Sequence, residues 1–484
     1  MVDHIAGVRA PPGSAPAGRP SRGPWLRELA ATWALGLPLA GSQLAWMGLA
    51  VTDVVVMGWY SPETLAAGGL GANYFFMPYV FGLGVVSAVS PLIAQRLGEG
   101  GRGHVRAVRR AVRQGLWVAI ALAIPAMLLC LAAGPAFRAM GQEPAVATDA
   151  GLYVLAAMPG LLPAFAIAAL RGFMASLSRG RPVLLVSLAA LPANAVLDYG
   201  LVFGAWGLPE LGVVGAGLAS TAVEYAMLAA LVALVLVDRQ FRRYAIFGRF
   251  WRADWQMFGQ LLRIGVPIGI TLLLEVGIFS AGAFLMGFFG VTALAAHQIA
   301  VQCAAVTFMI PYGLSQATTV RVGLFAGRRD AAGALRAGKA GAASALAVMA
   351  VMAVMFWLAG GPIASLFLDL SEPGSPAVAE MAAAYLAIAA VFQIVDGAQV
   401  AANGALRGLK DTAVPMAIVA VGYWVIAFPL ALYLGFELDL RGEGLWWALA
   451  AGLAVAAVTL TARFLFRMRR LTALWSSAAR AAAA

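Results

Sequence analysis

Long apolar segments alternate with short polar segments along almost the whole chain. A helix needs about 20 apolar residues to cross the hydrocarbon core of a bilayer. The pattern predicts twelve transmembrane helices, at residues 32–59, 65–94, 115–136, 151–170, 182–206, 212–237, 264–289, 292–320, 340–367, 381–406, 413–435 and 445–465. We therefore expect an all-α polytopic membrane protein.

The composition agrees with this fold class. Charged residues make up 11% of the chain, whereas about 25% of the residues of a soluble domain are charged. Most of the surface is therefore expected to contact membrane lipid. The formal net charge of +11 would suggest a nucleic-acid partner in a soluble protein. Here the basic residues flank the apolar segments, where they set membrane topology, and we expect no nucleic-acid partner.

The basic residues lie almost entirely on one side of the predicted membrane. Over alternate loops and the two tails, 31 of the 33 fall on the side of the N-terminus, and only Arg138 and Arg441 fall opposite. The positive-inside rule then places both termini in the cytoplasm. All basic residues except Lys339 and Lys410 are arginine, as in a GC-rich bacterial genome. We expect a multi-pass protein of the bacterial cytoplasmic (inner) membrane.

The two halves of the chain repeat. At an offset of 229 residues, Gly36-x-Pro38 corresponds to Gly265-x-Pro267, and at an offset of 236 the sequence ALRG recurs at 169–172 and 405–408. Both halves start on the same side, so the repeat is parallel, and such transporters bind substrate between their halves. The expected domains are a disordered cytoplasmic N-tail (1–31), an N-lobe (32–237), a cytoplasmic linker (238–263), a C-lobe (264–465) and a cytoplasmic C-tail (466–484).

Five acidic residues lie within the predicted helices, and no lysine or arginine accompanies them except at helix ends. They are Asp53, Asp198, Glu224, Glu275 and Asp396. A charge at the bilayer centre costs about 2.5–3.5 kcal/mol on insertion scales. The simplest explanation is that these carboxylates are protonated or bind a cation during part of the working cycle. Hydrogen bonding between helices is an alternative for any one of them, but not for all five.

The positions of these acids group them into two candidate sites. Asp53 and Asp198 are predicted at a similar depth near the outer surface, where they can share one site. Asn194 lies four residues before Asp198, so both project from one helix face. Carboxylate and amide oxygens suit Na⁺ and suit a proton relay equally well.

The remaining acids are predicted near the middle of the membrane. Glu275 and Asp396 belong to the second half and can form its acidic site, whereas the role of Glu224 stays open. The acids do not follow the repeat, because Asp53 corresponds to Gly282 and Glu275 to Trp46. The two lobes are therefore expected to do different work.

Nothing in the sequence indicates an enzyme or an ATP-driven pump. The segment GALRAGKA at 333–340 is close to a P-loop, but no strand precedes it and no Ser or Thr follows its lysine. There is no nucleophile constellation. We expect no ATP, no cofactor apart from the coupling ion, and a monomer.

Several segments together resemble the multidrug and toxic compound extrusion (MATE) family, in its NorM-like branch. They are LGLP at 35–38, TDVVVMG at 52–58, PELGVVGAG at 209–217, LAAHQIA at 294–300 and VDGAQVAANGALRGLKDT at 395–412. The resemblance implies a V-shaped pair of six-helix lobes and export of organic cations in exchange for H⁺ or Na⁺.

The resemblance also carries over site residues. Asp53, Asn194 and Asp198 match the N-lobe cation site of the family, and Glu275 and Asp396 match the C-lobe acids of the NorM-like branch. Since the chain has both sets, the ion and the lobe that binds it stay open. Glu224 is not carried over from the family.

Two other functions were weighed from the residues. A flippase or exporter of a lipid-linked or other non-drug metabolite would carry an anionic cargo and would need Arg or Lys in its cavity. The absence of basic residues from the predicted helix centres argues against it. The duplicated halves and unpaired acids argue against a receptor or a passive channel.

Overall fold

The computed structural model describes residues 23–101, 103–369 and 371–483, and regular structure in these ranges is helical. Twelve helical segments there are long and apolar enough to cross a membrane, as predicted. The first half contains α1 (Pro24–Tyr60), α2 (Pro62–Val86), α3 (Val89–Glu99), α4 (His104–Leu131), α5 (Ala133–Ala139), α6 (Pro144–Ala157), α7 (Leu161–Ser176), α8 (Arg181–Phe203), α9 (Val213–Val237) and α10 (Arg239–Arg242). The second half contains α11 (Trp255–Gly287), α12 (Val291–Gly327), α13 (Ala331–Ser365), α14 (Ser375–Gly408), α15 (Ala413–Ala420), α16 (Phe428–Leu432) and α17 (Arg441–Ala483), with two π-helical segments, η3 (Val421–Ala427) and η4 (Tyr433–Glu437).

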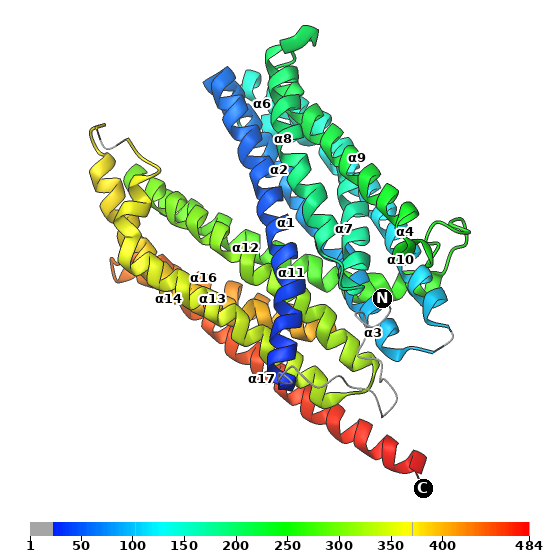
Figure 1. Cartoon of the computed structure of the whole chain (residues 1–484). Coiled ribbons are helices and arrows are strands. Elements are labelled where there is room, and N and C mark those ends of the chain that lie inside the picture. Colours follow the sequence, from blue (N-terminus) through cyan, green and yellow to red (C-terminus); the bar gives the residue numbers. More distant parts are fainter. Residues whose placement is uncertain (1–22, 102, 370, 484) are drawn as a thin grey trace, which may run out of the picture.

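The helices form two bundles that meet at one end and diverge at the other, in a V (Figure 1). One large hydrophobic core lies within each bundle. The helix α11 takes part in both, because Leu261 and Ile268 pack in the N-lobe core and Ile278 and Met286 pack in the C-lobe core. The lobe boundary predicted at residue 264 is therefore not a packing boundary.

The two lobes touch at the ends of the helices that carry the arginine-rich loops, which we call the inner end. A Cβ atom at Gly313 of α12 would collide with the backbone of Ala40 of α1, and one at Gly327 of α12 would collide with the backbone of Gln95 of α3. Only glycine permits approaches this close. The lobes are thus sealed together at the inner end, and the V opens at the opposite, outer end.

An ion pair reinforces this inner seal. The Nε and Nη2 atoms of Arg321 on α12 donate to the two carboxylate oxygens of Glu28 on α1, each at 2.7 Å. Glu28 is buried. A bidentate pair of this kind fixes orientation as well as distance, so it holds the two lobes in register.

Most observed helices extend past the predicted ends at the inner side. Helix α1 begins at Pro24 instead of residue 32, α11 begins at Trp255 instead of 264, and α17 continues to Ala483 instead of ending at 465. Hydropathy follows only the apolar part of a helix, whereas backbone hydrogen bonding continues into charged turns whose side chains have partners, as Glu28 has in Arg321.

These extensions correct the predicted domain limits. Residues 24–31 are helical, so the prediction of a disordered N-tail is wrong for these residues. Residues 1–22 lie outside the described residues. The predicted linker 238–263 contains α10 and the first turns of α11, and the C-tail continues α17 up to Ala483. The P-loop-like segment 333–340 lies inside the helix α13, whereas a P-loop must be a loop between a strand and a helix.

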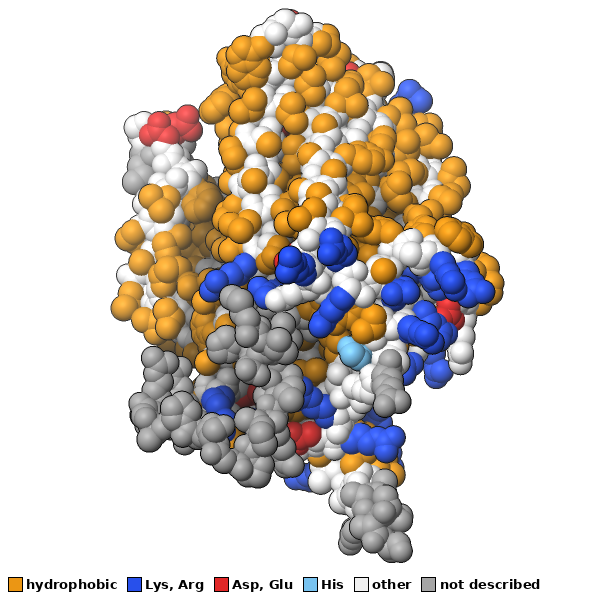
Figure 2. Space-filling view, turned by 45° about the vertical axis from the view of Figure 1, so that its right-hand side comes forward, with side chains coloured by type: hydrophobic (Ala, Val, Ile, Leu, Met, Phe, Trp, Pro, Cys, Tyr) orange, Lys and Arg blue, Asp and Glu red, His pale blue; other side chains and the backbone are white. Residues whose placement is uncertain are grey.

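The surface agrees with a membrane-spanning fold. On the face drawn in Figure 2, hydrophobic side chains cover the upper part, and Lys and Arg side chains gather below it. An apolar face bounded by basic residues is what a lipid-embedded protein presents.

Candidate functional site

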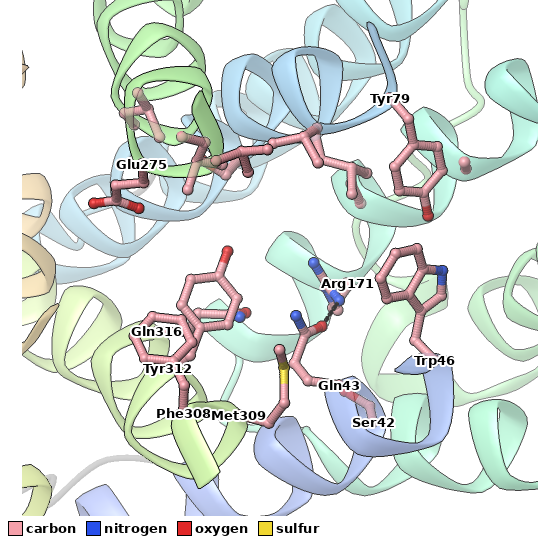
Figure 3. Close-up of a pocket in the computed structure, with 18 of the residues that line it drawn as sticks. Ser42, Gln43, Trp46, Tyr79, Arg171, Glu275, Phe308, Met309, Tyr312 and Gln316 are labelled. Carbon is pink, nitrogen blue, oxygen red and sulfur yellow. Dashed lines mark hydrogen bonds between the residues drawn. The ribbon is translucent and has the colours of Figure 1, made fainter. Parts of the chain in front are cut away.

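A cavity of about 370 Å³ lies between the lobes, within the size range of small-molecule sites. Both halves of the chain supply its walls. From the N-lobe come Gln43, Trp46, Tyr79, Arg171 and Glu224, and from the C-lobe Glu275, Phe308, Tyr312, Gln316, Asp396 and Arg407. Figure 3 shows several of these side chains around the central space. A ligand held here would contact both lobes at once.

The N-lobe wall of the cavity is mainly aromatic. The rings of Trp46 and Tyr79 stack with their centroids 5.3 Å apart, and they face one another in Figure 3. Glu224, whose role the sequence left open, also lines the cavity and is within electrostatic range of Arg171. Aromatic faces beside a carboxylate suit a flat organic cation.

The C-lobe wall carries the two acids that the sequence assigned to one site. Glu275 on α11 and Asp396 on α14 both line the cavity. Glu275 accepts a hydrogen bond of 3.1 Å from the Nε2 of Gln399, one turn beyond Asp396. The rings of Phe308 and Tyr312 stack at 5.7 Å on the neighbouring helix α12. This wall thus offers negative charge next to flat apolar surface.

Asp53, Asn194 and Asp198 of the N-lobe form a separate, buried cluster, as the sequence predicted. The Nδ2 of Asn194 donates to Asp53 Oδ1 at 2.6 Å and to Asp198 Oδ2 at 2.5 Å. Ser220 on α9 donates to Asp53 Oδ2 at 2.7 Å. Asn194 and Asp198 meet because residues four apart lie on one face of α8, and α1 brings Asp53 against that face.

The chemistry of this cluster is that of a cation or proton site. The Oδ1 atoms of Asn194 and Asp198 are buried and have no hydrogen-bond partner among the described residues. The two carboxylates accept from the same Nδ2 atom of Asn194, which holds them next to each other. Two buried carboxylates this close cannot both be ionised cheaply, so the cluster favours either a shared proton or a bound cation.

The two sets of acids differ in access. Asp198 is 0% exposed and Asn194 1% exposed, and the cluster does not belong to the cavity wall as far as the structure describes it. Glu275 and Asp396 face the cavity directly. A large organic molecule in the cavity would therefore meet the C-lobe acids, whereas the N-lobe cluster is accessible only to something as small as an ion.

Sequence reasoning missed two polar partners of these acids. Ser220 lies four residues before Glu224, and Gln399 lies three residues after Asp396. Either spacing places a polar side chain next to an acid along one helix face. That signal was available, but it did not show that Ser220 donates to Asp53.

The sequence argument from missing basic residues needs a correction. Arg171 and Arg407, which lie near the inner ends of α7 and α14, both line the cavity. The cavity reaches deep enough between the lobes to include helix ends that hydropathy assigned to loops. The absence of basic residues from helix centres therefore does not make the cavity free of positive charge.

A known protein family matches the chain once in each half. The family model MatE matches the chain twice, over residues 38–200 and 267–433. The chain belongs to the MatE family. The two matches begin at Pro38 and Pro267, the positions that the internal repeat pairs, and the predicted duplication is confirmed.

Relatives of similar length support the assignment. The chain is 43% identical to the probable multidrug resistance protein NorM of Mesorhizobium japonicum over 92% of its own length and 95% of that protein. It is 39% identical to the protein of the same name from Pseudomonas aeruginosa, covering 93% of this chain and 91% of that protein. The predicted resemblance to NorM-like MATE proteins is confirmed.

Solved structures share the fold of this MatE protein. The eukaryotic MATE transporter AtDTX14 superposes with a TM-score of 0.81 at 20% identity, covering 93% of this chain and 99% of that one. A MATE family transporter described as outward-facing gives a TM-score of 0.83 at 18% identity, covering 94% and 99%. The predicted V of two six-helix lobes is confirmed.

Proposed function

We propose that this MatE-family protein is a secondary antiporter that exports organic cations across the bacterial cytoplasmic membrane in exchange for H⁺ or Na⁺. The observation that carries the proposal is the pairing of a cavity lined by acids and aromatic rings with a separate buried cluster of acceptor oxygens. The multidrug resistance names of relatives about 40% identical support the same substrate class.

In this proposal the two sets of acids take different cations. The coupling ion binds at Asp53, Asn194 and Asp198. Ser220 orients Asp53 there, and the buried Oδ1 atoms of Asn194 and Asp198, which have no hydrogen-bond partner among the described residues, can coordinate the ion. The organic cation binds in the cavity, where Glu275 and Asp396 supply charge. Glu224 takes part at the aromatic wall.

Exchange then requires that the two cations favour different states of the lobes. A ligand shifts a conformational equilibrium only by its differential affinity for the two states. Substrate leaves the cavity through the outward-opening V, the coupling ion binds at the N-lobe cluster, and the lobes return by rocking about the repeat axis. Opening towards the cytoplasm separates Glu28 from Arg321 and breaks the inner seal. Both termini face the cytoplasm, the working unit is a monomer, and no ATP is consumed.

The alternative of a flippase for a lipid-linked anion is less favoured. Arg171 and Arg407 supply positive charge, but Glu224, Glu275 and Asp396 line the same cavity. Three carboxylates around a phosphate-bearing cargo are repulsive.

The deciding experiment is transport of a dye cation such as ethidium in proteoliposomes, with Na⁺ and H⁺ gradients imposed separately. Transport that one gradient drives, and that is lost in Asp53→Asn or Asp396→Asn, supports antiport and names the ion. Absence of transport under both gradients, with folded protein verified by gel filtration, would contradict the proposal and favour a non-drug cargo.

A further inference from the structure

Two hydrogen-bond donors at the inner end of the cavity lack acceptors. The Nε of Arg407 on α14 and the Nε2 of Gln316 on α12 are buried and have no hydrogen-bond partner among the described residues. Both residues line the cavity. A buried polar group without a partner costs free energy comparable to that of a lost hydrogen bond, so such groups in a binding cavity point to a ligand that completes them.

The internal repeat shows that Arg407 differs from its counterpart. At the offset of 236, Arg407 corresponds to Arg171. The Nη1 of Arg171 donates to the side-chain oxygen of Gln43 on α1, and the pair lies in the middle of Figure 3. At the offset of 229, the counterpart of Gln43 is Leu272. The second lobe thus keeps the arginine and has leucine where the first lobe supplies its acceptor.

The charge around Arg407 also leaves it available. None of the ion pairs in the described ranges includes Arg407. Its positive charge acts on Glu275 of the same cavity. A guanidinium presents its donors in a rigid plane that matches a carboxylate. The cavity therefore holds a negative site and an unsatisfied positive site on one wall.

We propose that Arg407 and Gln316 form a subsite for a carboxylate group of the transported molecule. On this reading, which rests on the proposed export of organic cations, the cavity recognises organic cations that also bear a carboxylate. The cationic part lies by Glu275 and Asp396 and the aromatic rings, and the carboxylate lies on Arg407 and Gln316. Such a zwitterion satisfies both donors and leaves the cavity with no net change of charge.

The test uses two dyes that differ in this one group. Rhodamine 110 carries a free carboxylate, and rhodamine 123 is its methyl ester with the same cationic ring system. Binding of each dye to purified protein is measured by fluorescence polarisation at pH 7, for the wild type, Arg407→Gln and Gln316→Leu. Arg239→Gln, which removes an exposed arginine of α10 far from the cavity wall, is the matched control for loss of one positive charge.

Arg407→Gln is expected to weaken rhodamine 110 binding about tenfold, as for loss of a hydrogen bond between charged groups, and to leave rhodamine 123 binding equal or tighter. The ratio of the affinity for rhodamine 110 to the affinity for rhodamine 123 should fall about threefold in Gln316→Leu. The same ratio should not change in Arg239→Gln. Equal weakening of both dyes, or no change in the ratio, would overturn the subsite. Failure of the wild type to bind or transport rhodamine 123 would instead count against the proposed cation export.

Discussion

The two lobes carry opposite arrangements on the same duplicated scaffold. In the N-lobe the acids lie inside the bundle, around Asp53, and the corresponding position of the C-lobe is Gly282, which has His297 as its neighbour. At the cavity wall the acid belongs to the C-lobe, because Glu275 of the C-lobe corresponds to Trp46 of the N-lobe. Asp53 and Asp198 thus have no acidic counterpart inside the C-lobe, and Glu275 has none at the matching position of the N-lobe, whose one acid on the cavity wall is Glu224.

The different placement of the acids in the two lobes shows that duplication preserved the positions of the helices but not those of the acidic residues. Glycine and proline positions repeat because they set close packing and helix geometry, as at Gly36 and Gly265. The acids do not repeat, and under the proposed function this difference provides an enclosed site for a small ion and an open site for a large cation. A single symmetric design would provide one kind of site twice.

The largest effect is expected when the enclosed site of the N-lobe is neutralised. Asp198→Asn should reduce gradient-driven dye export by roughly 100-fold, because loss of one charged partner from a buried cluster is severe. Dye binding should stay within about twofold of wild type, since Asp198 does not line the cavity. Proteoliposome transport and polarisation binding, measured on the same preparation, separate the two effects. Equal loss of binding would mean that the lobes do not divide the work.

The converse change should affect the open site alone. Asp396→Asn should weaken binding of an organic cation by about tenfold, because a charge-assisted contact is lost in the cavity. Binding of the coupling ion, followed by the thermal shift that it produces, should be unaltered. If Asp396→Asn removed the thermal shift and spared dye binding, the assignment of the two lobes would have to be reversed.

Smaller effects should follow from the neutral partners of the acids. Ser220→Ala removes one of the hydrogen bonds to Asp53, and Gln399→Leu removes the hydrogen bond to Glu275. Each should weaken only the ligand of its own lobe by about fivefold, the value of one hydrogen bond. Isothermal titration with the ion, and fluorescence polarisation with the dye, would show whether either variant also changes the affinity for the ligand of the other lobe.

The smallest effect is expected at the connection between the lobes. Asp254 caps α11, and Arg110 of α4 donates to its carboxylate at 2.5 Å. The hydrogen bond from Arg110 holds the pKa of Asp254 below its ordinary value. Its contribution to stability is thus present above the ordinary pKa of about 3.9 and is lost as the pH falls further. Asp254→Asn, which retains a capping side chain, should lower the melting temperature by about 2 °C at pH 7.

The pH dependence provides the check on that prediction. The difference between wild type and Asp254→Asn should shrink as the pH approaches the folded-state pKa of Asp254. Dye and ion affinities should both stay unchanged at pH 7, because the residue lies in neither site. A difference in melting temperature that persisted unchanged in acid would show that the cap, and not the charge, is responsible.

The sequence predicted much of this architecture because its signals are local or periodic. Helix spans follow from hydropathy, and the meeting of Asn194 with Asp198 follows from helical spacing. The depth of Asp53 in its own helix correctly predicted its partners on α8. Each of these inferences requires only the spacing of residues within one helix, or the similar depth of two residues in the membrane.

What the sequence could not predict depends on how helices tilt and face each other. Arg171 and Arg407 lie next to loops in the sequence, yet the lobes converge so that these residues line the cavity. The direction of Ser220 depends on the rotation of α9 about its axis. The helix ends at Pro24 and Ala483 depend on charged turns that hydropathy does not count.

The seal at the inner end also has a consequence for speed. Its close approaches at Gly313 and Gly327 are contacts with the backbone of the opposite lobe, which separate without any ion pair having to break. Glu28 and Arg321, by contrast, must each recover a full shell of water whenever they part. Separation of the Glu28–Arg321 ion pair, and not of the glycine contacts, should therefore limit the rate at which the lobes part at the inner end, and hence the rate of transport.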